Sequence, residues 1–160
     1  MDPSIADAFF TPSEEDRLLE EGLASRPIKT AAYGLAGAGF LVATVGLQTL
    51  LIGGQTIVKV CAYAMLIGGV LSIALSTRLM RGKAWTLTPA IALALVLSIG
   101  SGTFFVWSFT QGVVSLLALL AVGGGLTAAI LVGLAIGPFG RMLRARKTLR
   151  ERGIDVAFDF

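Results

Sequence analysis

No charged side chain occurs between residues 84 and 140, a stretch of 57 residues. A membrane-crossing helix needs about 20 predominantly apolar residues, so this stretch accommodates two such helices and a turn between them. Carboxylates are absent from a longer stretch, since no Asp or Glu stands between Gly22 and Arg150. Together with a hydrophobic share of 55%, this segregation of charge predicts an integral membrane protein.

Four apolar runs predict the transmembrane helices. They cover approximately residues 31–52, 57–77, 87–107 and 113–136. Lipid offers the backbone no hydrogen-bond partner, so uninterrupted runs of this length are expected to fold as helices. The predicted fold is therefore an all-α integral membrane protein with four transmembrane helices.

A faint internal repeat accompanies the four runs. A shift of 56 residues aligns Gly46 with Gly102 and Gln55 with Gln111. Both halves would start on the same side of the membrane, so the two helical hairpins are interpreted as parallel repeats.

Three regions are expected along the chain. Residues 1–29 form an acidic tail with a short helix over 12–24, which Thr11 caps and Glu14 closes in a capping box. Residues 30–137 form the four-helix transmembrane domain. Residues 138–160 form a basic helix, which Pro138 separates and bends away from the fourth span, followed by an aromatic and acidic tail.

The basic residues predict the orientation of the chain. With four crossings, one side of the membrane receives all the bases that flank the spans except Lys59. Cytoplasmic segments carry the excess of Lys and Arg, so both termini are expected in the cytoplasm. The basic helix after the fourth span is expected to contact anionic lipid headgroups or a partner protein. Its candidate binding residues are Arg141, Arg144, Arg146, Lys147 and Arg150.

Small residues recur at every fourth position in the spans. Because residues four apart share one helix face, each stripe offers a flat surface on which another helix packs closely. The expected packing residues are Ala64, Gly68 and Ser72 in the second span, Ala90, Ala94, Ser98 and Gly102 in the third, and Ala121, Gly125, Ala129 and Gly133 in the fourth. The pattern does not separate packing within the chain from packing between subunits.

Residues that carry out chemistry are scarce. The chain has no histidine, a single cysteine at Cys61, and no acid within a predicted span. These absences exclude imidazole ligation, dithiol redox chemistry and the usual carboxylate of an ion-coupled carrier. We therefore expect no catalytic residue, no metal, no cofactor and no nucleic-acid partner.

The expected function follows from what remains. Flat helix faces and charged tails favour a non-enzymatic multi-pass membrane subunit, an accessory component or assembly factor that contacts membrane lipids, other membrane subunits or copies of itself. The alternative is an oligomeric channel or carrier for a neutral or anionic solute, with Gln48 and the serines lining the path.

Overall fold

The computed structural model describes residues 13–23, 25–52, 56–110 and 116–154, and every regular element within these ranges is helical. Four helices are long and apolar enough to cross a membrane, which confirms the predicted all-α fold to that extent. They are α3 (Arg26–Ile52), α4 (Thr56–Met80), α5 (Leu87–Thr110) and α6 (Leu116–Glu151). The two shorter elements are α2 (Glu14–Gly22) and the 3-10 turn η1 (Ala84–Thr86).

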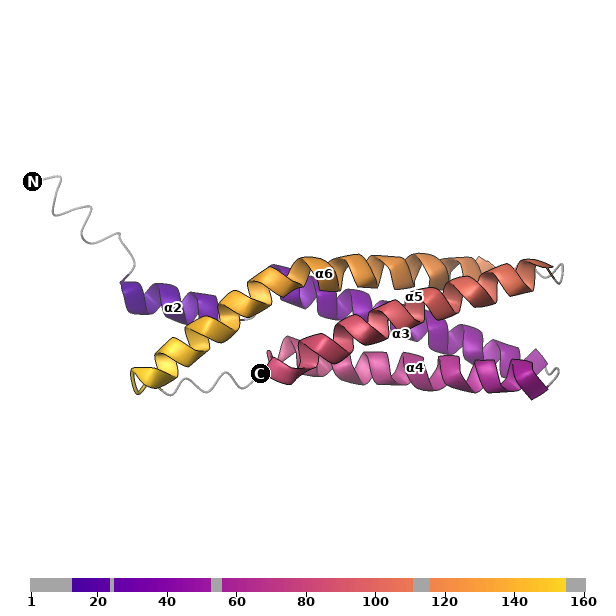
Figure 1. Cartoon of the computed structure of the whole chain (residues 1–160), viewed down its shortest axis with the longest axis horizontal. Coiled ribbons are helices and arrows are strands. Elements are labelled where there is room, and N and C mark those ends of the chain that lie inside the picture. The colour runs from indigo at the N-terminus through magenta and orange to yellow at the C-terminus, as the bar shows by residue number, and fades with distance from the viewer. Residues whose placement is uncertain (1–12, 24, 53–55, 111–115, 155–160) are drawn as a thin grey trace, which may run out of the picture.

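The four long helices lie side by side and alternate in direction (Figure 1). Helix α3 packs most extensively on α4 and α6, and α5 packs on α6, whereas α4 and α5 contact each other over a much smaller area. At one end of the bundle, α2 and the last part of α6 extend beyond the other helices (Figure 1). These two segments contact each other.

Helix α6 corrects the expectation that Pro138 separates a basic helix from the fourth span. It is one helix of 36 residues, with Pro138 inside it, and its rise of 1.5 Å per residue makes it about 54 Å long. Proline removes one backbone donor, and α6 changes direction towards its yellow end without breaking (Figure 1). The helix continues because Phe139 and Met142, one and four residues after the proline, are buried in the same core cluster as Ile28 and Leu79.

Helix α2 also begins differently from the expectation. Its N-cap is Ser13, whose side chain accepts from the Asp16 backbone N–H, while the Asp16 carboxylate accepts from the Ser13 backbone N–H at 3.1 Å. This capping box replaces the expected one between Thr11 and Glu14. Thr11 lies outside the described residues.

Helices α3 and α4 are in close backbone contact at a pair of glycines. A Cβ atom added at Gly39 would lie 2.6 Å from the Gly69 carbonyl oxygen, and one added at Gly69 would overlap the backbone of Gly39 and Ala43. Three residues further along α4, Ser72 is fully buried and its Oγ donates to the Leu35 carbonyl of α3 at 2.8 Å. The two backbones thus touch directly, which only residues without a side chain permit.

Candidate functional site: the two faces of helix α6

One face of α6 is buried along its whole length and is here named the inner face. Its buried residues recur at intervals of three and four, so they stay on one stripe along the helix. They are Ala118, Ala121, Gly125, Ala128, Val132, Ala135, Phe139, Met142, Ala145 and Leu149. The stripe passes from the apolar part of α6 into residues 139–151, here named the arm.

Arg146 anchors the arm to two other segments. Its Nε donates to the Gly22 carbonyl at the end of α2, at 2.9 Å, and its Nη1 donates to the Gly82 carbonyl at 3.1 Å. Partial burial lowers the pKa of the Arg146 guanidinium, through loss of solvation. The group stays charged because arginine titrates far above neutral pH. One side chain therefore joins the end of α2, the turn after α4 and the arm.

Gly82 allows this junction to close. Its φ of +64° lies in the left-handed region, which favours glycine. A Cβ atom at Gly82 would also lie 2.7 Å from the Met142 terminal methyl and 2.9 Å from an Arg146 terminal nitrogen. The turn thus needs glycine for its backbone conformation and for its contact with the arm.

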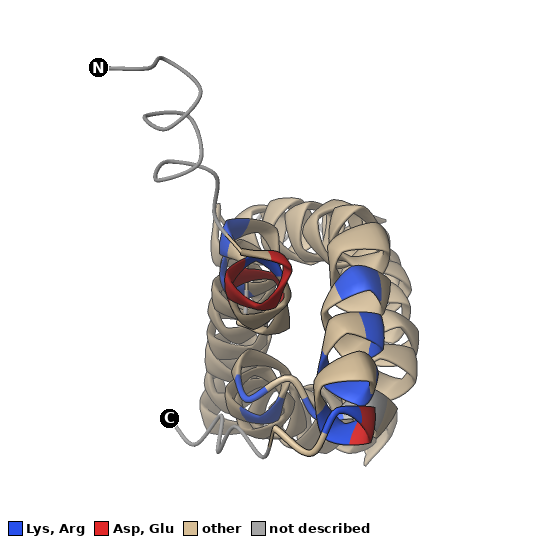
Figure 2. Cartoon of the chain, turned by 90° about the vertical axis from the view of Figure 1, so that its left-hand side faces the viewer, with Lys and Arg blue, Asp and Glu red and all other residues tan. Residues whose placement is uncertain are grey.

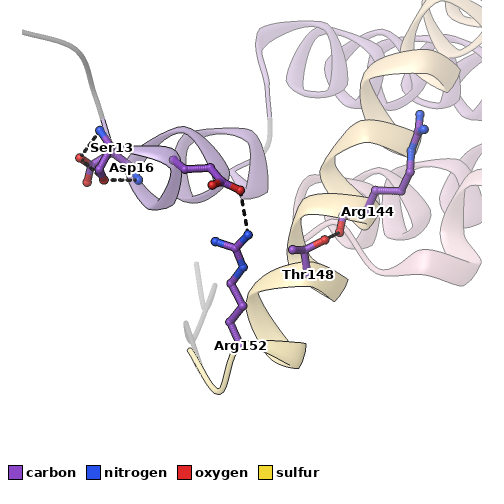
Figure 3. A network of polar contacts seen from close by, with 6 residues as sticks. Ser13, Asp16, Arg144, Thr148 and Arg152 are labelled. Carbon is purple, nitrogen blue, oxygen red and sulfur yellow. Dashed lines mark hydrogen bonds and ion pairs between the residues drawn. The ribbon is translucent and has the colours of Figure 1, made fainter.

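Helix α2 crosses the arm obliquely, with its C-terminal end at Arg146 and its N-terminal end at Arg152 (Figure 3). There Arg152 donates to the Glu14 carboxylate at 2.8 Å, in an exposed ion pair (Figure 3). The apolar contribution of α2 is modest, since Leu18 and Leu19 are half-buried and Gly22 is its one buried residue. Arg144 extends from the other side of the arm, away from α2 (Figure 3).

The face of α6 opposite the buried stripe is exposed throughout and is here named the outer face. It too follows intervals of three and four, and it runs without interruption from the apolar part of the helix onto the arm. Its residues are Gly123, Leu126, Ile130, Gly133, Gly137, Arg141, Arg144 and Lys147. A Cβ atom added at any of its three glycines would meet nothing within 4 Å.

The five candidate basic residues do not share one position on α6. Arg146 belongs to the junction with α2, while Arg141, Arg144 and Lys147 lie on the outer face and Arg150 is exposed near the end of the arm. Figure 2 shows the bases spread along the arm and the acids gathered mainly on α2. Two of the three outer-face bases bond within α6: Arg144 donates to the Gly140 carbonyl at 3.4 Å, and Lys147 pairs with Glu151 at 3.8 Å.

The small residues expected at every fourth position also separate. In α6, Ala121 and Gly125 are buried, Ala129 is half-buried and Gly133 is exposed. In α5, Ala90 and Ala94 are buried, whereas Ser98 and Gly102 are half-buried. In α4, Ser72 is buried, Gly68 is half-buried and Ala64 is exposed. The exposed residues of this set, Ala64 and Gly133, are not buried by packing within this chain, and their role between subunits stays a prediction.

Polar side chains in the long helices are mostly bonded to their own helix. Ser76, Ser101 and Ser108 are buried and donate to backbone carbonyls three residues earlier. Gln48 is exposed on α3. Among the described residues no observation favours a polar path, and the channel alternative stays a prediction.

An apolar cavity of about 550 Å³ lies between α4 and α5, where these helices diverge. Its lining includes Cys61, Gly100, Thr103, Phe104 and Trp107. The Thr103 hydroxyl donates to the Ile99 carbonyl, so it is already engaged. In the part of the chain that the structure describes, no group of three His, Cys, Asp or Glu residues is placed to hold a metal ion.

Comparison with known protein families, with curated proteins and with solved structures gave no match for this chain. Its own chemistry and geometry are therefore the basis for proposing a function.

Proposed function

We propose that the chain is an integral membrane protein that crosses the bilayer four times, with both termini in the cytoplasm. Large apolar side chains on the bundle surface support this placement, among them Leu51 at 79% exposure and Leu134 at 66%. A surface of this kind is stable in lipid and prone to aggregate in water. The bases at the end of the bundle that carries the arm support the orientation.

Single-cysteine labelling tests the orientation. In a Cys61→Ser background, Thr110→Cys at the end of α5 should react with an impermeant maleimide added outside intact cells. Lys147→Cys on the arm should react only after the membrane is opened. External labelling of Lys147→Cys, with Thr110→Cys protected, would reverse the proposed topology.

We further propose that the chain is a non-enzymatic accessory or assembly subunit of a larger membrane complex. The outer face of α6 is the observation that carries this proposal. Glycine within a helix is less favourable than alanine by about 1 kcal/mol in aqueous hosts. A glycine that faces lipid makes no packing contact with another helix that would offset this loss. Gly123, Gly133 and Gly137 face outward with open space beside them, so a second helix could approach the α6 backbone closely.

The bases on the same face extend the proposed interface beyond the hydrocarbon. Arg141 lies five residues past Ile136, about 7.5 Å along the helix, and this is headgroup depth if the span ends near Ile136. Lys147 lies eleven residues past the same point, about 16.5 Å along the helix, and the change of direction of α6 makes its height above the bilayer smaller than this length. Arg141 therefore suits anionic lipid, and Lys147, which lies further from the apolar part of α6, suits an acidic surface of the partner subunit.

Crosslinking in native membranes tests the proposed interface. A photoreactive amino acid at position 133 should give a protein adduct of one defined mass, with a different subunit or with a second copy. The matched control is position 37 on α3, an exposed glycine that also has nothing within 4 Å of an added Cβ. It should react with lipid. Lipid adducts from both positions would contradict the proposal.

A further inference from the structure

The contact between α2 and the arm is anchored mainly at its two ends. Arg146 holds the Gly22 carbonyl, and Arg152 holds the Glu14 carboxylate. Between these anchors in the sequence of the arm lies Leu149, which is 1% exposed, and Leu18 and Leu19 of α2 are half-buried. The segment from Arg146 to Arg152 at the end of the arm, with its buried leucine and an arginine at each end, is here named the strip.

Neither anchor depends on a feature that is unique to α2. The last carbonyls of any helix lack intrahelical donors and carry the negative end of the helix dipole, which suits the Arg146 guanidinium. An acid in the first turn is common in helices for the complementary reason. These anchors therefore suit a class of segment: a helix of two to three turns with an acid in its first turn and leucines on one side.

The arm has a second point of attachment besides α2. Arg146 also donates to the Gly82 and Arg81 carbonyls, and Met142 packs on Gly82 in the turn after α4. Helix α2 in turn keeps its own capping box, which lies within residues 13–16. Leu23, which follows α2, has an extended backbone, so α2 does not run on as a helix at this residue. A rotation at Leu23 would therefore move α2 off the arm without unwinding α3.

We propose that this strip of the arm is a docking site for a short acidic amphipathic helix of a partner subunit. In the isolated chain α2 occupies the site, and on assembly the partner helix displaces it. The ion pair between Arg152 and Glu14 is exposed, and such pairs contribute little and weaken as salt rises, so this anchor is readily released. This inference rests on the proposed function, because it assigns the partner a second contact beside the outer face of α6.

A peptide with the sequence of residues 13–23 serves as the probe. It is labelled with a fluorophore and titrated against the full chain in nanodiscs of neutral lipid, with binding read by anisotropy. The double variant Leu18→Asp and Leu19→Asp weakens the tethered α2 and should bind the peptide at least about tenfold more tightly than the wild-type chain, because the competing segment no longer fills the site. A scrambled peptide of the same composition should not bind. Equal binding of the two peptides, or no gain in the double variant, would overturn the proposal.

A charge exchange tests the pairing at one anchor. In the double variant, Arg152→Glu should weaken peptide binding, and a peptide carrying Glu14→Lys should restore it. Arg146→Gln should abolish binding of the unchanged peptide and of the Glu14→Lys peptide. If Arg146→Gln misfolds, the exchange at Arg152 still decides the question. Loss at Arg152 without restoration by the exchanged peptide would count against the proposal.

The remaining outcomes identify the occupant and separate the two proposals. Dimers of the wild-type chain that the peptide disperses would show that α2 of a second copy is the occupant, which overturns the assignment to a partner subunit. Crosslinks from position 133 without peptide binding would defeat only this inference. Peptide binding without crosslinks from position 133 would defeat the proposed interface on α6.

Discussion

Gly69→Leu is expected to disrupt the packing of α3 on α4 and to lower the stability of the bundle by about 3 kcal/mol. A Cβ atom at this position would overlap the Gly39 carbonyl oxygen, and it would lie 2.7 Å from the Ala43 Cβ and 2.8 Å from the Ala43 backbone nitrogen. Backbone atoms cannot rotate out of the way as a flexible side chain does, so the two helices must separate. Overpacking of a core costs about 1–3 kcal/mol and occasionally more, and a backbone clash belongs at the upper end.

The neighbouring glycine supplies a matched control. A Cβ atom at Gly68 would meet the end of Leu97 at 3.5 Å, an ordinary contact with a side chain that can move. Gly68→Leu should therefore lower the unfolding free energy by less than Gly69→Leu, when both are measured by steric trapping or SDS titration in detergent micelles. Similar losses at the two positions would show that the α3–α4 contact is not as close as described.

The number and type of the long helices were predictable from the sequence because they depend on one property, an apolar run long enough to cross a bilayer. The capping of α2 was less predictable. Thr11 and Ser13 both precede an acid by three residues, and the sequence does not decide which of them caps the helix. The separation of two helices expected at Pro138 was wrong for a related reason. Proline by itself favours a break, but the packing of Phe139 and Met142 stabilises the helix beyond it.

The packing faces were predictable only in part, because a period of four is not the period of the bundle. A helix has 3.6 residues per turn, so a stripe of every fourth residue rotates by about 40° at each step. In α6 the expected stripe begins on the inner face at Ala121 and Gly125 and reaches solvent or lipid at Gly133. Intervals of three and four follow the face correctly, and on that period Gly133 belongs with Gly123 and Gly137.

Arg146 shows what lay outside prediction from the sequence. It stands among five other basic residues of the same segment, and composition does not distinguish it from them. Its role depends on the end of α2 and on the turn at Gly82, which are more than 60 residues away in the sequence. Contacts of that kind appear only when the helices are placed in space.

Gly133→Leu is expected to disassemble the complex that the chain forms while leaving the chain itself folded. Open space surrounds this position within the chain, so leucine meets no internal obstacle. On the outer face, a leucine would hold a partner helix away from the α6 backbone and remove the close contact that glycine permits. Each 1.4 kcal/mol lost in association weakens assembly tenfold, and a full leucine at the centre of the contact should cost at least that.

The apparent mass of the complex extracted from native membranes in mild detergent tests the interface on α6 most directly. The wild-type chain and Gly37→Leu should migrate in one large complex, and Gly133→Leu should migrate as a folded chain near its own mass of 16.6 kDa plus detergent. If all three migrate in the same large complex, or all three migrate alone, the outer face of α6 is not the interface.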